Sequence, residues 1–391
     1  MHGKYESSSR QGGKGWIAVL LAVLVLAAVT AGILLKKNGG IAPTEPSVPE
    51  TSAETTEATT EATTEATTEA TTEPAPVYTN PLTGEVVDEP VTRRVFSVSI
   101  NNLRDSLPHI GTMSADIYME MFVNYSIIRG IAFYTDPTDV PAIGSVRSTR
   151  PIFSQLSRIF DTVMLHAGGT GYALNDAKQR GVDGFNIDTP GDSGYSFRDK
   201  DRLKQGYGLE HTLFVRGTTI TDEAVNRGIR VDADPEKDYG LRFSENAVPE
   251  NGEDAAAVSL TFSYNGSKKD TSMIYDGSLG KYVYNQYGKS MVDGATDEPE
   301  AFKNVVILLA EMKFVGHGYH QADFLLGGEG YFATEGKLIP IQWHCDTEEG
   351  PLRLETKDGE ELHLNVGNSY FAIAAVGSPV TWEAAAADTA E

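Results

Sequence analysis

Three consecutive segments have clear secondary-structure patterns: Asp161-Thr-Val-Met-Leu-His166, Ala167-Gly-Gly-Thr-Gly171 and Tyr172 to Arg180. The first is typical of a buried strand, the second of a tight turn, and the third of a helix that ends at Gly181. This order places backbone N–H groups at the start of a helix, where an anion can bind. His166 falls at the carboxyl end of the strand, where ligands bind in open α/β sheets. A core histidine with satisfied hydrogen bonds is an equally good interpretation of His166.

The glycine spacing of this turn matches neither the dinucleotide-binding motif nor the P-loop. The sequence therefore argues against a nucleotide site. Upstream lies Gly144-Ser-Val-Arg-Ser-Thr-Arg-Pro151, in which Pro151 biases Arg150 toward an extended backbone. Such a loop can present the guanidinium groups of Arg147 and Arg150 to a carboxylate or a phosphate.

An alternative for these two arginines is structural. They would then form internal ion pairs with acidic residues such as Asp116, Glu120 or Asp199. Both interpretations stay open at the level of the sequence.

Two further segments, Phe197-Arg-Asp-Lys-Asp-Arg202 and Leu209-Glu-His-Thr-Leu-Phe214, add polar candidates. A histidine beside a carboxylate can act as a general acid or base. A nucleophile motif of the Gly-x-Ser-x-Gly kind is absent, so no catalytic residue is assigned. The predicted ligand-binding residues are Arg147, Arg150, His166, Arg198, Asp199 and His211.

A series of short motifs runs through the first folded part: Asn80-Pro-Leu-Thr-Gly84, Ile100-Asn-Asn102, Ala115-Asp-Ile-Tyr-Met-Glu120, Ile128-Arg-Gly-Ile131, Gly144 to Pro151, His166-Ala-Gly-Gly169 and Phe197-Arg-Asp199. In this order they resemble the YerB-like family of bacterial envelope lipoproteins. The similarity extends from about Asn80 to Ser378. The resemblance implies a mixed α/β amino-terminal domain, a β-rich carboxy-terminal domain and no established activity. Family members usually carry a lipid-anchoring cysteine after the signal peptide, and here the single cysteine is Cys345.

The amino-terminal segment predicts a membrane anchor in place of that lipid. Trp16 to Leu35 is apolar and uncharged, with Lys14 before it and Lys36 and Lys37 after it. At about 1.5 Å per residue, such a helix spans the hydrocarbon core of roughly 30 Å. A cleaved signal peptide has a shorter apolar region of about 7 to 15 residues. The slight excess of positive charge before the span places the amino terminus in the cytoplasm and the folded part outside.

Residues 36–77 are dominated by Thr, Glu, Ala and Pro, with Glu-Ala-Thr-Thr repeated from Glu57, Glu61, Glu65 and Glu69. They contain too little apolar surface to offset the entropy of ordering. We expect a disordered, charge-extended stalk.

The carboxy-terminal half has the pattern of strands. Val258 to Tyr264, Lys281 to Tyr284 and Leu338 to Trp343 alternate apolar and polar residues, as half-buried strands do. Asn304 to Leu309 is apolar on both faces, which predicts a central strand. Asp276-Gly277, Glu335-Gly336 and Asp358-Gly359 predict hairpin turns. Arg94 to Asn101, in the first half, also alternates and predicts a half-buried strand.

Composition excludes some partners and cofactors. The formal charge of -23 argues against nucleic acid, which is bound by clustered Lys and Arg. The histidines at His317, His320, His344 and His363 match no zinc spacing, so no metal and no cofactor are predicted. Cys345 is interpreted as a small buried hydrophobic residue.

The sequence thus predicts an α+β protein in the cell membrane with a single span. The predicted segments are a cytoplasmic end (1–15), a transmembrane helix (16–35), a stalk (36–77), an α/β domain (78–235), a connection (236–257), a β-rich domain (258–384) and a disordered tail (385–391). The favoured function is a binding module for an anionic or glycan envelope ligand. A structural or partner-docking protein and a hydrolase or transferase acting on envelope polymers are the alternatives. The oligomeric state is left open.

Overall fold

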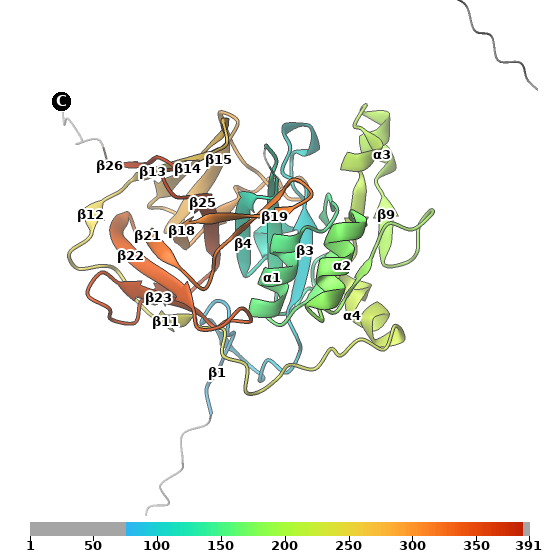
Figure 1. Cartoon of the computed structure of the whole chain (residues 1–391), viewed down its shortest axis with the longest axis horizontal. Helices are drawn as coiled ribbons and strands as arrows, with labels where there is room; N and C mark the ends of the chain where they lie inside the picture. The colour runs from blue at the N-terminus through green and yellow to red at the C-terminus, as the bar shows by residue number, and fades with distance from the viewer. Residues whose placement is uncertain (1–75, 125, 386–391) are drawn as a thin grey trace, which may run out of the picture. The chain divides into compact units, whose positions relative to one another are not determined.

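A mixed sheet of eleven strands runs through the folded part of the chain and includes strands from both of its predicted domains (Figure 1). The computed structural model describes residues 76–124 and 126–385. Ten strands follow one another in the order β12 (Glu253–Asp254), β22 (Lys337–Cys345), β21 (Gly328–Thr334), β18 (Asn304–Ala310), β25 (Ser369–Ala375), β4 (Ile117–Phe122), β5 (Ile128–Tyr134), β3 (Phe96–Ile100), β7 (Val163–His166) and β8 (Gly184–Asn186), and β23 (Leu352–Thr356) pairs with β22.

The two halves of the chain meet at the centre of this sheet. Strand β25, from the carboxy-terminal half, pairs in parallel with β4 on one side and with β18 on the other. Strand β18 lies inside the sheet between β21 and β25, which confirms the central strand predicted at Asn304 to Leu309. The fold is strand-rich with mixed sheets and few helices, as the α+β prediction requires in its general form.

Strand β3 corrects one prediction. All five of its residues are buried, so the half-buried strand predicted from alternation was wrong. The polar positions face the core with partners: Ser97 Oγ lies 2.7 Å from Thr162 Oγ1. Ser99 Oγ donates to the carbonyl of Ser148 (3.4 Å). The alternating serines of β3 therefore form hydrogen bonds inside the protein and do not face solvent.

Helices α1 (Pro151–Ile159) and α2 (Gly171–Gln179) cover one face of the sheet near β3 and β7 (Figure 1). Pro151 occupies the first turn of α1, where its missing N–H costs nothing. The side chains of Phe153 and Leu156 pack with Met119 of β4 and Phe133 of β5 in one core cluster. The predicted strand, glycine turn and helix at 161–181 are confirmed as β7 and α2.

A second sheet covers the other face of the main sheet, at the upper left of Figure 1. Its order is β16 (Lys289–Ser290), β15 (Lys281–Gln286), β14 (Ser267–Asp276), β13 (Ala257–Tyr264) and β26 (Val380–Glu383), and β17 (Ala301–Phe302) pairs with β15. Tyr282 and Tyr284 are fully buried in the core between the sheets, so they are structural. The hairpins predicted at Asp276-Gly277 and Glu335-Gly336 join β14 to β15 and β21 to β22.

Short elements complete the fold. They are β1 (Tyr78–Thr79) with β2 (Val86–Val87), β6 (Ile143–Gly144) with β10 (Leu213–Val215) and β9 (Ser196–Arg198), β11 (Arg242–Ser244) with β24 (His363–Asn365), β19 (Met312–Gly316) with β20 (Tyr319–Ala322), helices α3 (Lys200–Lys204) and α4 (Gly217–Asn226), and the 3₁₀ turns η1 (Arg104–Ser106), η2 (Thr112–Ser114) and η3 (Leu209–His211). Helix α4 begins at Gly217. A side chain at 217 would collide with the carbonyl oxygens of Pro137 and Val140, so glycine permits this close start.

The predicted membrane span at Trp16 to Leu35 and nearly all of the predicted stalk lie outside the described residues. Within residues 76–124 and 126–385, no helix has the length and apolar character needed to cross a membrane.

Candidate functional site

The loop that joins β6 to α1, residues 145–150, crosses the carboxyl ends of two parallel strands. The N–H of Arg147 donates to the carbonyl of Ser99 in β3 (2.9 Å). The N–H of Ala167, just after β7, donates to the carbonyl of Arg147 (2.9 Å). The backbone of Arg147 is therefore fixed between β3 and β7, at the edge where a ligand was expected.

A third arginine, which the sequence analysis did not single out, joins the two predicted ones. Arg129 of β5 is buried, and its Nη1 donates to the carbonyl of Ser148 (2.7 Å). Nη1 of Arg150 donates to the same carbonyl (3.3 Å). The pKa of Arg129 is lowered to about 9, chiefly by burial and to a smaller extent by the charges of Arg150 and Arg147. We refer to Arg129, Arg147 and Arg150 as the arginine cluster.

The described residues form no ion pair with the arginine cluster. In the part of the chain that the structure describes, no carboxylate lies within ion-pair distance of any of its three guanidinium groups. The Nε atom of each one is buried without a hydrogen-bond partner. Burial also lowers the pKa of Arg147 and of Arg150. The charge of Glu210 acts on Arg147 from beyond ion-pair distance and opposes the effect of burial on its pKa. Three buried or half-buried like charges without an ion-pair partner form a site that is short of an anion.

The ion pairs proposed as the alternative from the sequence are not formed. Asp116 accepts a hydrogen bond from the N–H of Thr135 (2.6 Å). Glu120 pairs with Lys269 on the other face of the sheet. Asp199 caps helix α3. These three carboxylates are therefore not the partners of Arg147 and Arg150.

His166 and the start of α2 lie beside the cluster. His166 Nδ1 is 2.8 Å from the carbonyl oxygen of Gly168, and burial lowers the pKa of the imidazole. The guanidinium of Arg150 lies over the ring of Tyr319, 5.6 Å from its centroid. The hydroxyl of Tyr319 is 2.9 Å from Oγ1 of Thr170, the N-cap of α2. Arg150 and the amino-terminal end of α2 are thus connected through one tyrosine.

His211 reaches the same region from the opposite side. Its Nδ1 is 2.8 Å from the side-chain nitrogen of Asn101, which directly follows β3. Burial lowers the pKa of His211; the charge of Glu210 opposes this shift, and the charge of Arg147 adds to it. The structure therefore brings Arg147, Arg150, His166 and His211 to the loops at one end of β3 and β7.

Arg198 and Asp199 are used internally. Nη2 of Arg198 donates to Asp188 (2.6 Å), and its Nη1 donates to the carbonyl of Leu209 (2.7 Å). Asp199 accepts hydrogen bonds from the N–H groups of Asp201 (2.8 Å) and Arg202. Arg198 thus holds the segment that carries His211, Asp199 caps α3, and the described contacts place neither residue in the arginine cluster.

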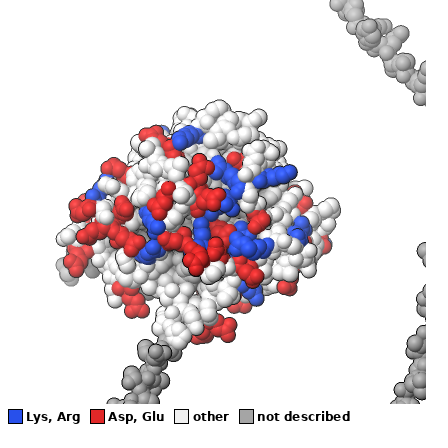
Figure 2. Space-filling model, turned by 60° about the horizontal axis from the view of Figure 1, so that its bottom comes forward, with Lys and Arg blue, Asp and Glu red and all other residues white. Residues whose placement is uncertain are grey.

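Most other arginines of the described chain form ion pairs with carboxylates. Figure 2 shows a face on which acidic and basic side chains lie next to one another over much of the surface. The carboxylate of Asp238 contacts both Arg242 (3.1 Å) and Arg353 (2.9 Å). Its hydrogen bond with Arg242 is the main reason why the pKa of Asp238 falls to about 2. In a chain with 55 acidic and 32 basic residues, this pairing is the usual arrangement, and the arginine cluster departs from it.

A buried pair on the opposite face of the main sheet was also not predicted from the sequence. Glu120 of β4 is fully buried and forms an ion pair with Lys269 of β14. It also accepts hydrogen bonds from Asn102 (2.7 Å), Tyr370 (2.5 Å) and Tyr284 (3.2 Å). Each oxygen of this carboxylate therefore has several donors, as a buried charge requires.

Metal and thiol chemistry have few candidates in the structure. Residues 76–124 and 126–385 contain no group of three or more His, Cys, Asp or Glu side chains placed to hold a metal ion. Cys345 is buried at the end of β22, and burial raises the pKa of its thiol to about 12. The interpretation of Cys345 as a small buried hydrophobic residue is confirmed.

Comparison with known families identifies the chain. The protein of unknown function (DUF3048) N-terminal domain matches residues 82–230, and the DUF3048 C-terminal domain matches residues 258–371. The chain belongs to the DUF3048 family. All three residues of the arginine cluster fall within the match to the DUF3048 N-terminal domain, as does Glu120, whereas Lys269 falls within the C-terminal match.

Similar proteins agree with this assignment. "Putative lipoprotein YerB" of Bacillus subtilis (strain 168) is 26% identical to this DUF3048 chain over 297 residues, which cover 75% of this chain and 85% of the relative. The crystal structure of the YerB protein from Bacillus subtilis matches with a TM-score of 0.66 at 23% identity, covering 78% of this chain and 99% of that chain. The second likeness shows a shared fold. The resemblance to the YerB-like family is confirmed.

Proposed function

We propose that this protein binds an anionic group of a cell-envelope component through the arginine cluster. The observation that carries the proposal is the convergence of Arg129, Arg147 and Arg150 without an acidic partner among the described residues. Elsewhere in the fold, arginines such as Arg242 meet a carboxylate. A ligand anion supplies the missing counter-charge.

The chemistry of the cluster suits a phosphate or a carboxylate. A guanidinium group presents several N–H donors in a planar fork that matches either anion. Half-buried donors interact more strongly with an anion than donors in bulk water do, because the local dielectric is lower. A bound anion also reduces the repulsion among the three arginines. This reduced repulsion stabilises the bound state in addition to the hydrogen bonds.

The proposal assigns binding and no reaction. The imidazole of His166 has the carbonyl of Gly168 as a partner, and that of His211 has Asn101. Burial lowers the pKa of both rings, which favours their neutral forms.

We place this module outside the cytoplasmic membrane. The name of the Bacillus subtilis relative describes a lipoprotein, which is a membrane-associated protein. The apolar run from Trp16 to Leu35 supplies a membrane anchor for this chain, and the acidic stalk after it separates the folded part from the bilayer. Envelope polymers that carry phosphate or carboxylate groups are then within reach.

Retention on cell-wall material tests the proposal. The purified full chain in detergent is sedimented with wall fragments that retain their anionic polymers, and with the same fragments after these polymers are stripped. Replacing Arg147→Gln and Arg150→Gln together is expected to reduce retention at least about tenfold, because each charge-assisted hydrogen bond contributes about 1.5 to 3 kcal/mol. Stripped fragments are expected to retain the native chain no better than the double variant.

A matched control carries the same change of charge. The double variant Arg242→Gln and Arg353→Gln removes two arginines that share Asp238, and we expect it to bind like the native chain. Equal retention of the native chain and the Arg147/Arg150 double variant contradicts the proposal. Equal loss in both double variants attributes binding to net charge and contradicts it as well.

A further inference from the structure

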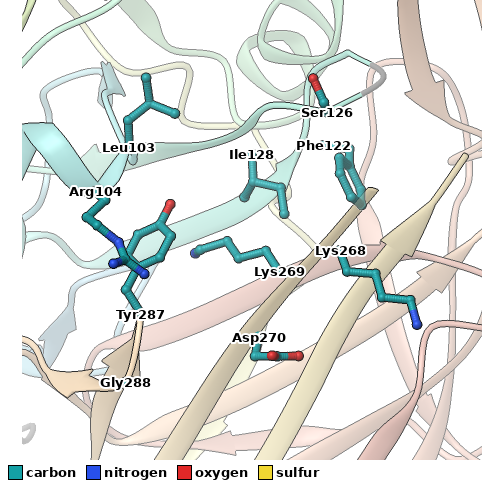
Figure 3. A pocket seen from close by; sticks show the side chains of 10 residues that line it. All are labelled: Leu103, Arg104, Phe122, Ser126, Ile128, Lys268, Lys269, Asp270, Tyr287 and Gly288. Atoms are coloured by element: carbon teal, nitrogen blue, oxygen red, sulfur yellow. The ribbon is translucent and has the colours of Figure 1, made fainter. Parts of the chain in front are cut away.

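A cavity of about 540 Å³ lies on the face of the main sheet that is opposite the arginine cluster (Figure 3). Ile128 lines the cavity and belongs to the core between the two sheets. The next residue of β5, Arg129, points to the other face, because successive side chains of a strand alternate. The two regions share this strand and are otherwise separate, so the following inference does not rest on the proposed function.

The walls of this cavity combine apolar and basic side chains. Leu103, Phe122 and Ile128 form an apolar part, and Arg104, Lys268 and Lys269 are the basic residues. The acidic residue among the lining side chains is Asp270. An excess of basic residues is notable in a chain whose acidic residues outnumber its basic ones by 55 to 32. The cavity therefore favours an anion over a cation.

The basic groups differ in whether they are neutralised. Lys269 is nearly buried and pairs with Glu120, so its charge is compensated. In the described part of the chain, Arg104 has no carboxylate within ion-pair distance. Figure 3 shows Arg104 and Lys269 on either side of the ring of Tyr287, while Lys268 points away. The distances to the ring centroid are 5.1 Å from the Arg104 guanidinium and 5.3 Å from the Lys269 ammonium. Arg104 is thus an exposed cation at the cavity wall that lies over the Tyr287 ring and has no ion-pair partner among the described residues.

A second hollow of about 370 Å³ adjoins the first and shares Arg104 and Tyr287 with it. Its other lining residues include the apolar Leu107, Pro108 and Met291. Arg104 therefore stands between two partly apolar hollows. A ligand that places its charge at this arginine has apolar surface to contact on both sides.

We propose that this cavity binds a small amphiphilic anion, with its carboxylate or phosphate at Arg104 and its apolar part against Leu103, Phe122 and Ile128. The volume lies within the range of roughly 300 to 1,000 Å³ that is common for small-molecule sites. Burial of hydrocarbon against the apolar walls is favourable by about 25 cal/mol of free energy per Å² of apolar surface removed from water. A bare inorganic anion gains nothing from those walls, which separates this site from the arginine cluster.

Protection of arginine side chains tests the proposal. The full chain in lipid nanodiscs is treated with phenylglyoxal, and the modification rates of Arg104 and Arg147 are followed by peptide mass spectrometry. Benzoate, phenyl phosphate, inorganic phosphate and benzyl alcohol are the competitors. Benzoate or phenyl phosphate at several times its dissociation constant is expected to slow modification of Arg104 about fivefold. Inorganic phosphate and benzyl alcohol at the same concentration are expected to leave Arg104 unprotected.

Variants identify the apolar wall. Leu103→Ser changes the wall outside the regular strands and is expected to abolish protection of Arg104. Leu174→Ser, the same change at an exposed position of α2, is expected to preserve it. Protection by benzoate alone assigns a carboxylate ligand, and protection by phenyl phosphate alone assigns a phosphate ligand.

Two outcomes overturn the inference. One is equal protection of Arg104 by inorganic phosphate and by phenyl phosphate. The other is the absence of protection by both aromatic anions. Protection of Arg147 by inorganic phosphate reports on the arginine cluster, so the failure of either proposal is visible separately.

Discussion

The two faces of the main sheet treat buried positive charge in opposite ways. On one face, Lys269 lies against Glu120, which also accepts hydrogen bonds from Asn102 and two tyrosines. On the other face, Arg129 lies with Arg147 and Arg150 and has no carboxylate partner among the described residues. The first arrangement is complete without a ligand, whereas the second lacks a counter-charge.

This difference separates structural charges from functional ones. A buried charge that is only structural is expected to have its partners within the fold, because leaving it unpaired is costly. Glu120 and Lys269 meet that expectation and connect the two sheets. The arginine cluster does not meet it, so its electrostatic cost points to a role in binding.

The largest expected effect on stability belongs to the compensated face. Glu120→Gln leaves the ammonium of Lys269 buried without its counter-charge, so we expect a loss of about 3 to 5 kcal/mol in the free energy of unfolding. Urea unfolding, followed through the fluorescence of the buried Trp343, measures it. Glu298→Ala, at an exposed position, is the control, with an expected change within about 0.5 kcal/mol.

A second substitution sharpens this result. Adding Lys269→Met to Glu120→Gln removes the unpaired charge, and the double variant is expected to be more stable than the single one. If the single variant is as stable as the native chain, the pair does not hold the two sheets together and the comparison fails on this side.

A smaller effect concerns the exposed pairs of Asp238. The pKa of this carboxyl is lowered from its ordinary value of 3.8 to about 2, chiefly by its hydrogen bond with Arg242. A lowered folded-state pKa contributes stability that is present above about pH 4 and is lost as the pH falls through about 2. Because the carboxylate is 40% exposed, the contribution is about 0.5 to 1 kcal/mol after screening by solvent.

Acid titration of stability checks this expectation. Asp238→Asn is expected to lower the unfolding free energy at pH 6 slightly, and this difference is expected to shrink as the pH falls from about 4 and to vanish below about pH 2. A constant difference between the two proteins from pH 6 to pH 2 means that the charge of Asp238 is not the cause.

Much of the fold was readable from local pattern. The strand, turn and helix at residues 161–181 follow from apolar residues, glycines and a helix end that lie next to one another in sequence. The central strand β18 follows from an unbroken apolar run. The loop with Arg147 and Arg150 was identified because two arginines and a proline stand close together.

Contacts between residues far apart in the sequence could not be predicted from it. Lys269 and Glu120 are 149 positions apart, and neither residue signals the other. Arg129 was not predicted as a site residue because the rest of its strand has the pattern of a core strand. The signal that was available is chemical: an arginine inside a buried strand requires a partner, and no neighbour in sequence supplies one. The serines of β3 led to the wrong prediction of a half-buried strand. Alternation of apolar and polar residues does not show whether the polar side chains face solvent or form buried hydrogen bonds.

The unpaired state of the arginine cluster is the central claim, and the response of stability to an anion tests it most directly. Urea unfolding of the full chain is measured at low salt with and without inorganic phosphate, for the native chain and for the double variant Arg147→Gln and Arg150→Gln. The account predicts that phosphate at about ten times its dissociation constant raises the free energy of unfolding of the native chain by about 1.4 kcal/mol and leaves the double variant unchanged. It also predicts that, without phosphate, the two proteins differ by less than about 1 kcal/mol, since the loss of hydrogen bonds from Arg150 is offset by reduced repulsion. A loss of several kcal/mol in the double variant without phosphate, or equal stabilisation of both proteins by phosphate, contradicts it.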